Sequence, residues 1–90
     1  MRYSYDSIKK KSNLKKHGLD FDDAQSVIES GQTVTFEDNR FDYDEPRFIT
    51  MGVLGDAIVV ITTTESDTEI RIISMRKAEK NEQKIYFSNL

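Results

Sequence analysis

The stretch Glu69–Tyr86, EIRIISMRKAEKNEQKIY, begins with the pattern of a strand and ends with the composition of a helix. In its strand part, Ile70 and Ile72 fall on one face and Arg71 and Ile73 on the other, because successive side chains of a strand alternate. Arg71 therefore shares a face with apolar residues. A charged group on such a face needs a partner, so the stretch predicts either an internal ion pair or a site for an anion.

Three segments before this stretch also have strand character. The segments RFITMGVL and AIVVITTTE are rich in β-branched residues, and Gly55-Asp56 separates them by the length of a two-residue hairpin loop. The earlier segment TVTFED places Val34 and Phe36 on one face. These patterns predict a four-stranded antiparallel meander with strands at 33–38, 47–54, 57–65 and 69–75.

Helices are predicted on both sides of the meander. A first helix is expected to begin after Asp6 or Ser7, which are good N-caps, and to end near His17, just before a glycine. A second helix is expected to begin directly after Asp20, another good N-cap. A third follows the last strand. The order predicts the α+β class, as a single domain over residues 1–90 with two N-terminal helices and one C-terminal helix.

The expected strand register makes both faces of the sheet apolar, so each face must be covered. In this register Arg47 and Arg71 lie near each other on one face. A slip of one residue would exchange the two faces. The expected faces are Phe48, Leu54, Val59, Ile61, Ile70 and Ile72 on one side, and Arg47, Ile49, Met51, Val60, Arg71, Ile73 and Met75 on the other.

Composition restricts the class of protein. Hydrophobic residues make up 37% of the chain and charged residues 32%, which is typical of a soluble globular domain. No run of about 18 apolar residues is present that would span a membrane, and the first residues lack the apolar region of a secretion signal. The chain has no cysteine, which excludes disulfides and thiolate metal sites. The expected compartment is the cytoplasm.

The charge is unevenly distributed along the chain. Residues 1–17 carry six lysines and arginines against one aspartate, whereas residues 18–46 carry nine carboxylates against one arginine. This asymmetry predicts either a basic contact surface on an acidic body or a solvated, lysine-rich helix face.

Few motifs of known chemistry are present. The glycines stand at turns rather than in a phosphate-binding loop, and one histidine without a recognisable nucleophile gives no Ser-His-Asp set. The acidic stretch at 37–45 lacks the glycine and the terminal spacing of a calcium loop. It is interpreted as a solvated loop, with a metal site as the alternative. His17 is either a helix-end residue that interacts with the dipole or an acid–base group. Arg71 and Arg76 either form internal ion pairs or bind an anion.

Four elements of the chain resemble the BrnT family of bacterial type II toxins in order and spacing. SNLKKHGLDFDDA resembles the Asn-x-x-Lys-His-Gly-x-x-Phe-x-x-Ala element of that family, and RIISMR resembles its Arg-Ile-Ile-Ser-x-Arg strand. EPRFITMG is similar to its Glu-x-Arg-Phe-x-x-x-Gly segment, and the last helix keeps a Glu-x-x-x-Tyr spacing. The matching residues are Asn13, Lys16, His17, Gly18, Phe21 and Ala24; Glu45, Arg47, Phe48 and Gly52; Arg71, Ile72, Ile73, Ser74, Arg76, Lys77 and Ala78; and Glu82 and Tyr86.

This resemblance implies a fold similar to that of RelE-type ribonucleases and endonucleolytic cleavage of RNA in the cytoplasm. It also implies neutralisation by an antitoxin of the BrnA type. The toxin–antitoxin complex would contact promoter DNA only through the DNA-binding domain of the antitoxin. No membrane partner is expected.

With the activity that this resemblance implies, the chain is expected to be a metal-independent ribonuclease that needs no cofactor. RNA carries its own nucleophile, the 2′-hydroxyl, so the protein must deprotonate it, stabilise the charged phosphorane and protonate the 5′ leaving oxygen. With one histidine and no metal cluster, arginines are expected to stabilise the charge. The predicted catalytic residues are Arg47, Arg71 and Arg76 at the phosphate, with His17, Lys16 and Glu65 as proton-transfer candidates whose roles are unassigned.

The chain departs from the family pattern at one turn, where Thr-Glu-Arg-Gly is replaced by Thr64-Glu65-Ser66-Asp67. A cation is lost and an acid is gained near the expected phosphate site. This departure supports an alternative function, an inactive toxin-like module that only binds its antitoxin. The basic segment Lys9–Lys16 supports a second alternative, a DNA-binding regulator, although no helix-turn-helix pattern is apparent.

Overall fold

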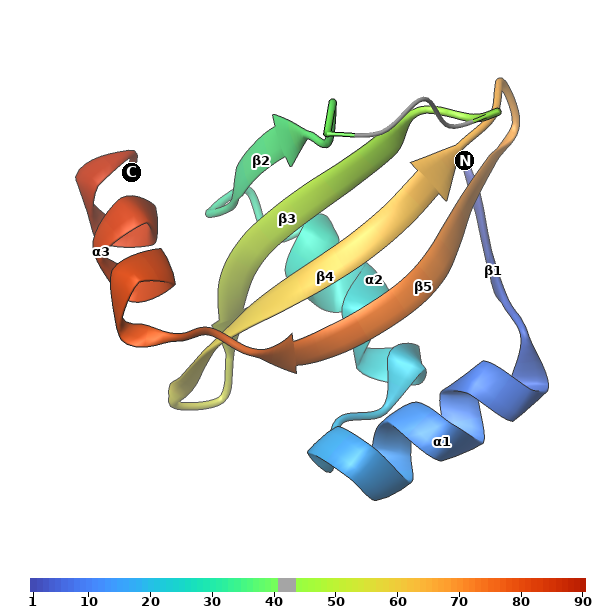
Figure 1. The fold of residues 1–90 in the computed structure, drawn as a ribbon, viewed down its shortest axis with the longest axis horizontal. Coiled ribbons are helices and arrows are strands. Elements are labelled where there is room, and N and C mark those ends of the chain that lie inside the picture. The colour runs from blue at the N-terminus through green and yellow to red at the C-terminus, as the bar shows by residue number, and fades with distance from the viewer. Residues whose placement is uncertain (41–43) are drawn as a thin grey trace.

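The elements of the fold are taken from a computed structural model, which describes residues 1–40 and 44–90. A five-stranded sheet is combined with helices (Figure 1), which confirms the predicted α+β class. Within the described residues, no helix has both the length and the apolar character needed to cross a membrane. The elements in chain order are β1 (Arg2–Tyr5), α1 (Ser7–His17), the 3-10 helix η1 (Phe21–Asp23), α2 (Ala24–Ile28), β2 (Val34–Glu37), β3 (Arg47–Leu54), β4 (Ala57–Glu65), β5 (Glu69–Lys77) and α3 (Lys80–Ser88).

The sheet has the strand order β1-β5-β4-β3-β2. Strands β2 to β5 form the antiparallel meander that the sequence predicts. The prediction of four strands is nevertheless wrong, because β1 adds a fifth strand in parallel with β5, with Tyr3 opposite Ile70. This four-residue edge strand gives no clear local pattern, since its pairing depends on a partner near the other end of the chain.

The predicted bounds of the first helix are confirmed in α1. Asp6 is the N-cap and accepts hydrogen bonds from the N–H groups of Ile8 and Lys9 at 2.8 and 3.2 Å. At the other end, Gly18 adopts a φ of 70°, and its N–H donates to the carbonyl of Leu14. The left-handed conformation there is one that glycine adopts at little cost.

The second predicted helix is divided in two. Asp20 accepts a hydrogen bond from the N–H of Asp22 at 2.9 Å, as an N-cap should, but the turn that it begins is η1 rather than an α-helix. Phe21 and Ala24 are both buried, and a 3-10 turn places residues three apart on the same side. The α-helix α2 then has only five residues, so the prediction of two N-terminal helices is confirmed only in part.

Apolar side chains cover both faces of the sheet. We call the face under η1 and α2 the α2 face, and the opposite one the α3 face. In Figure 1, α2 lies behind the strands. On the α3 face, Tyr86 is buried over Val34, Met51 and Val60, and its hydroxyl donates to the carbonyl of Gln32 at 2.7 Å. The core on the α2 face consists of Phe21, Ala24, Val27, Val59, Ile61, Ile70, Ile72 and Met75.

A β-bulge divides β5 into two halves. The pairing of β4 with β5 shifts by one residue, which leaves Ile73 as the extra residue on β5. An extra residue reverses the alternation of side chains beyond it. Met75, predicted to share a face with Arg71, is therefore buried on the α2 face opposite Ile61. The prediction was wrong at Met75 because it assumed regular alternation along the whole strand.

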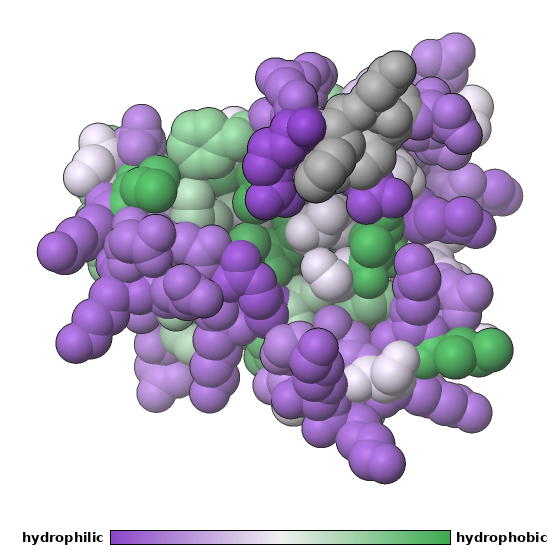
Figure 2. Space-filling model, in the orientation of Figure 1, coloured by the Kyte–Doolittle hydropathy of each residue, from purple (hydrophilic) through white to green (hydrophobic). Residues whose placement is uncertain are grey.

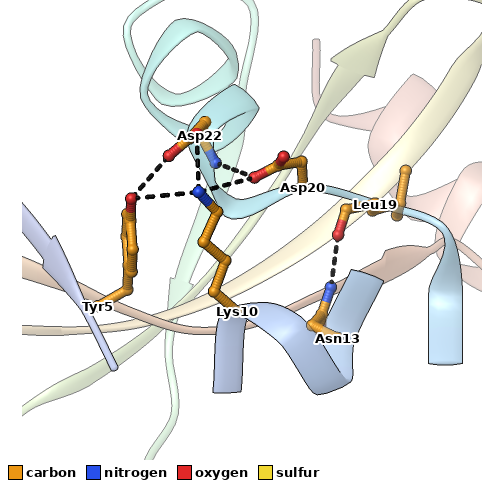
Figure 3. A network of polar contacts seen from close by, with 6 residues as sticks. All are labelled: Tyr5, Lys10, Asn13, Leu19, Asp20 and Asp22. Atoms are coloured by element: carbon orange, nitrogen blue, oxygen red, sulfur yellow. Dashed lines mark hydrogen bonds and ion pairs between the residues drawn. The ribbon is translucent and has the colours of Figure 1, made fainter. Parts of the chain in front are cut away.

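Beyond β1, one side chain from α1 pairs with the edge of β5. The Nδ2 of Asn13 donates to the carbonyl of Met75 at 2.9 Å, and its Oδ1 accepts from the N–H of Met75 at 3.1 Å. The same Nδ2 donates to the carbonyl of Leu19 at 3.0 Å (Figure 3). Among the residues of α1, all of which the structure describes, Asn13 alone is buried. Its amide thus replaces a neighbouring strand and holds α1 against the sheet.

A second polar cluster joins α1 to η1 (Figure 3). Lys10 Nζ donates to Asp22 Oδ2 at 2.8 Å and lies 3.7 Å from Asp20 Oδ1, while the Tyr5 hydroxyl donates to Asp22 Oδ1 at 2.8 Å. The hydrogen bond from Lys10 lowers the pKa of Asp22, and the same bond raises the pKa of Lys10. Lys10 is therefore engaged within the fold, unlike a lysine that only meets solvent.

Gly52 on β3 lies against α2 with no room for a side chain. A methyl group there would lie 2.6 Å from Val27 Cγ1 and 3.2 Å from Thr33 Cγ2. Valine is stiff at χ1, so the clash is not easily relieved. We expect Gly52→Ala to lower the free energy of unfolding by about 1–3 kcal/mol, the usual cost of overpacking. Chemical denaturation measures this loss.

The control for this prediction is the double variant with Val27→Ala, which removes the clashing methyl. Its loss of stability should be smaller than the sum of the two single losses, because the two sites are in contact. A loss equal to that sum would show that crowding against Val27 does not explain the glycine.

Candidate active site

The predicted arginine pair lies in one row across three strands. Arg47 of β3 is opposite Thr64 of β4, and Thr64 is opposite Arg71 of β5. The Cα atoms of the two arginines are therefore about 10 Å apart, or two interstrand spacings. Both side chains line a cavity of about 400 Å³ on the α3 face. The prediction that Arg47 and Arg71 share a face is confirmed by this register.

A second cavity, of about 240 Å³, adjoins the first, because Lys9 and Ile73 line both. One side of it comes from α1 and the other from β5. We call the two cavities together the α1 groove. The α1 residues that line the groove are spaced three, four and seven positions apart, as expected for one helix face. The remaining lining residues of the second cavity are Ser12, Asn13, Lys16, His17 and Ser74.

The groove carries more cations than carboxylates. The larger cavity is lined by three basic residues, Lys9, Arg47 and Arg71, and by the two acidic residues Asp44 and Glu45. In the smaller one, Lys9, Lys16 and His17 gather without a carboxylate among the described lining residues. In Figure 2 the side chains over α1 are mostly hydrophilic, and hydrophobic side chains appear over the sheet beside them. Such a field favours binding of a polyanion.

Arg71 lies at the β5 end of this row, opposite Thr64. It is exposed and makes no hydrogen bond or ion pair with the described residues. Glu69, two residues before Arg71, forms its ion pair with Arg2 at 3.6 Å. A hydrogen bond with Ser4 lowers the pKa of Glu69, and the charges of Arg2 and Arg71 add to this effect. Of the two interpretations that the sequence leaves open for Arg71, the internal ion pair is therefore absent from the described part of the chain, and the anion site is favoured.

Arg76 forms a bidentate ion pair. Its Nη1 and Nη2 donate to Oε1 and Oε2 of Glu82 at 2.8 and 2.9 Å. Glu82 Oε1 also accepts from the N–H of Glu79 at 2.9 Å, within the capping box of α3. The pair thus ties β5 to the first turn of α3, and it lies about 15 Å along the strand from Arg71. The structure does not bring Arg76 into the α1 groove. A role of Arg76 at the phosphate therefore stays a prediction.

The Arg76–Glu82 pair makes stability depend on pH. The hydrogen bonds from Arg76 lower the pKa of Glu82. A carboxyl with a lowered folded-state pKa stabilises the fold above its unfolded pKa of about 4.3, and this contribution is lost as the pH falls through the folded-state pKa. As the pH is lowered below about 4, we expect the melting temperature of Glu82→Gln to fall less steeply than that of the wild type.

Melting curves from neutral pH down to about pH 3 test this expectation. The matched control is Glu37→Gln on β2, because Glu37 forms no ion pair with the described residues. It should keep the wild-type slope. If Glu82→Gln also keeps that slope, the pair contributes nothing to acid stability.

Glu65 lies on the other face of the sheet from the arginine pair. It is opposite Ile70, which is in turn opposite Tyr3 of β1. Burial raises the pKa of Tyr3 to about 12, and a hydrogen bond with Glu29 and the charges of Glu29 and Glu65 add to this effect. The structure therefore places Glu65 near Tyr3 on the α2 face rather than in the α1 groove. Its part in proton transfer stays a prediction.

Sequence reasoning missed Lys9, which lines both cavities. Lys9 stands four residues before Asn13 and seven before Lys16, a spacing that places all three on one helix face. That signal was present in the sequence. The face that meets the sheet became apparent only from the hydrogen bonds of Asn13 to Met75.

The acidic stretch between β2 and β3 is a loop where it is described. Asp38 is buried, and Arg40 Nε and Nη2 donate to its two oxygens at 2.9 and 3.0 Å. Asp42 lies outside the described residues. In the described part of the chain, no three His, Cys, Asp or Glu side chains are grouped to hold a metal ion.

Comparison with protein families places the chain in a functional context. A family model described as "Ribonuclease toxin, BrnT, of type II toxin-antitoxin system" matches residues 5–82. The match covers most of the chain and includes every residue that lines the α1 groove. No curated protein matches the chain.

Proposed function

This chain belongs to the BrnT family of ribonuclease toxins of type II toxin–antitoxin systems, and we propose that it is a metal-independent endoribonuclease whose active site is the α1 groove. The family implies an RNA substrate and an antitoxin partner. The observation that carries the proposal is the row that sets Arg47 and Arg71 across one cavity, next to a second cavity with Lys16 and His17.

The proposed reaction is an internal transfer at a phosphate of RNA. The 2′-oxygen of a ribose loses its proton and bonds to the adjacent phosphorus, the bond from phosphorus to the 5′-oxygen breaks, and that oxygen takes a proton. The products are a 2′,3′-cyclic phosphate and a 5′-hydroxyl. Arg47 and Arg71 reach the phosphate from two strands and stabilise the charge of the phosphorane.

Proton transfer is assigned to the smaller cavity. His17 lines this cavity, and imidazole is the side chain that most often gives or accepts protons in general acid–base catalysis. Lys16 is its neighbour at the end of α1 and adds a positive charge. The proposed site is thus built from two strands and one helix, and it does not depend on Arg76 or Glu65.

We further propose that the antitoxin is of the BrnA type and that the complex acts on promoter DNA through the antitoxin. The toxin would act in the cytoplasm, where its RNA substrate is found. An acidic segment of the antitoxin is a suitable inhibitor, because it would occupy the same cationic groove as the RNA.

Incubation of the purified chain with RNA in EDTA tests the proposal. We expect fragments with 2′,3′-cyclic phosphate and 5′-hydroxyl ends, and we expect the antitoxin to prevent their formation. Intact RNA together with tight antitoxin binding would show an inactive toxin-like module instead. If the chain binds duplex DNA but does not cleave RNA, the alternative of a DNA-binding regulator would be supported.

A further inference from the structure

We propose that the two cavities of the α1 groove are consecutive phosphate subsites for a single strand of RNA, and that Lys9 is the binding residue that spans them. This inference rests on the proposed function, because it names the form of substrate that the groove takes. Lys9 and Ile73 are the residues common to the two cavities. A ligand that occupies both cavities is therefore in reach of Lys9 from either of them.

The length of the groove favours more than one phosphate. Lys9 and Lys16 are seven residues apart on α1, so their Cα atoms are about 10 Å apart along the helix. The arginine pair lies on the far side of Lys9, across β5 and β3. The cations therefore extend beyond the reach of a single phosphate group. Arg47 and Arg71 line one cavity, and Lys16 and His17 line the other.

The lining of the groove favours a single strand over a duplex. The groove lies between α1 and β5 and includes an apolar side chain in both cavities, whereas an RNA duplex is read through its shallow minor groove and its phosphates. Single strands expose bases and sugars that pack on apolar side chains. Ile73, which the bulge adds to β5, gives such an apolar surface in both cavities. Ser74 also lines the smaller cavity and can offer its hydroxyl to the sugar–phosphate backbone, whereas the Ser12 hydroxyl donates to the carbonyl of Ile8 at 2.9 Å and can only accept.

Lys9 is distinct from the other lysines of α1. Within the described residues its ammonium makes no hydrogen bond or ion pair, whereas Lys10 is held by Asp22. Lys11 and Lys15 are exposed and line neither cavity. Their positions in the helical repeat place them on the side of α1 opposite Lys9. They carry the same charge on the same helix and are therefore matched controls.

The experiment measures the binding of a 2′-O-methyl RNA trinucleotide, which carries two phosphates and lacks the nucleophile for cleavage. For single strands, the logarithm of the binding constant falls with the logarithm of the salt concentration by about 0.7 for each phosphate contact. We expect Lys9→Ala to lower this slope by about 0.7, Lys9→Arg to retain it, and Lys15→Ala to leave it unchanged. Melting temperatures establish that the variants are folded.

Substrate length gives a second measurement. Wild-type protein should bind the trinucleotide more tightly than a 2′-O-methyl dinucleotide with one phosphate, and Lys9→Ala should reduce this difference. Equal effects of Lys9→Ala and Lys15→Ala on the salt slope would overturn the inference, because they would show only a general attraction. So would a Lys9→Ala variant that binds the trinucleotide as the wild type does but binds the antitoxin more weakly.

The inference and the proposed function fail in different ways. If the trinucleotide binds with the expected dependence on Lys9 but no RNA is cleaved, the two-subsite inference is supported and the proposed ribonuclease activity is wrong. If RNA is cleaved and Lys9→Ala changes neither the salt slope nor the length dependence, the proposed ribonuclease activity is supported and the two-subsite inference is wrong.

Discussion

Replacing Arg71 by alanine is expected to slow RNA cleavage by roughly 10²–10³-fold, the scale for loss of one donor to a developing oxyanion, with no change in melting temperature. The fold should not be affected, because Arg71 is exposed and has no hydrogen-bond or ion-pair partner among the described residues. Arg71→Lys should recover only part of the rate, because an ammonium lacks the planar, bidentate geometry of a guanidinium. Cleavage rates and melting curves on the same preparations test both statements.

Arg76→Ala is the matched comparison on the same strand. It leaves the half-buried Glu82 without its bidentate partner, so its first effect should be a lower melting temperature. If Arg71→Ala lowers the melting temperature by many degrees and the remaining folded protein still cleaves RNA, Arg71 supports the fold and the chemistry lies elsewhere. If Arg76→Ala loses cleavage at an unchanged melting temperature, the sequence-based assignment of Arg76 to the phosphate is restored.

Replacing Asn13 by alanine is expected to lower the free energy of unfolding by about 3–5 kcal/mol, the largest effect on stability that we predict. Three hydrogen bonds are lost, and both the N–H and the C=O of Met75 are left without partners at a buried position. A buried polar group without its partner costs about 1–3 kcal/mol. For a domain of this size the melting temperature should fall by more than about 10 °C.

Two further variants show whether the amide itself is responsible. Asn13→Asp keeps the acceptor but loses the two donated bonds, and it places a negative charge beside the carbonyl oxygens of Leu19 and Met75. It should therefore be destabilising at neutral pH, and less so in acid, where the carboxyl is protonated. Ser12→Ala, at an exposed neighbouring position, should change stability by less than about 0.5 kcal/mol. Equal effects at both positions would contradict the role of Asn13.

The meander and the shared face of Arg47 and Arg71 could be predicted because they depend on local rules. Period-two alternation and the two-residue loop at Gly55 fix the register of β3 and β4, with Leu54 opposite Ala57. That register then places Arg47 and Arg71 on one face, on either side of Thr64.

The features that escaped prediction depend on contacts between distant parts of the chain. β1 pairs with β5, and Asn13 pairs with Met75, so neither is apparent from a local pattern. The bulge at Ile73 changes the face of Met75 without any glycine or proline to mark it. The pairing of Arg76 with Glu82 could not be predicted either, because the sequence does not show which carboxylate of the last helix faces the strand.

The attachment of α1 through one buried amide and a surface ion cluster has a consequence for local unfolding. Elements with few buried apolar contacts open more often than the core, and their amides exchange hydrogen with solvent sooner. The amides of α1 should therefore exchange before those of β3 and β4, whose side chains fill the core. Since α1 supplies Lys9, Lys16 and His17, the groove would disassemble at a denaturant concentration at which the central strands are still protected.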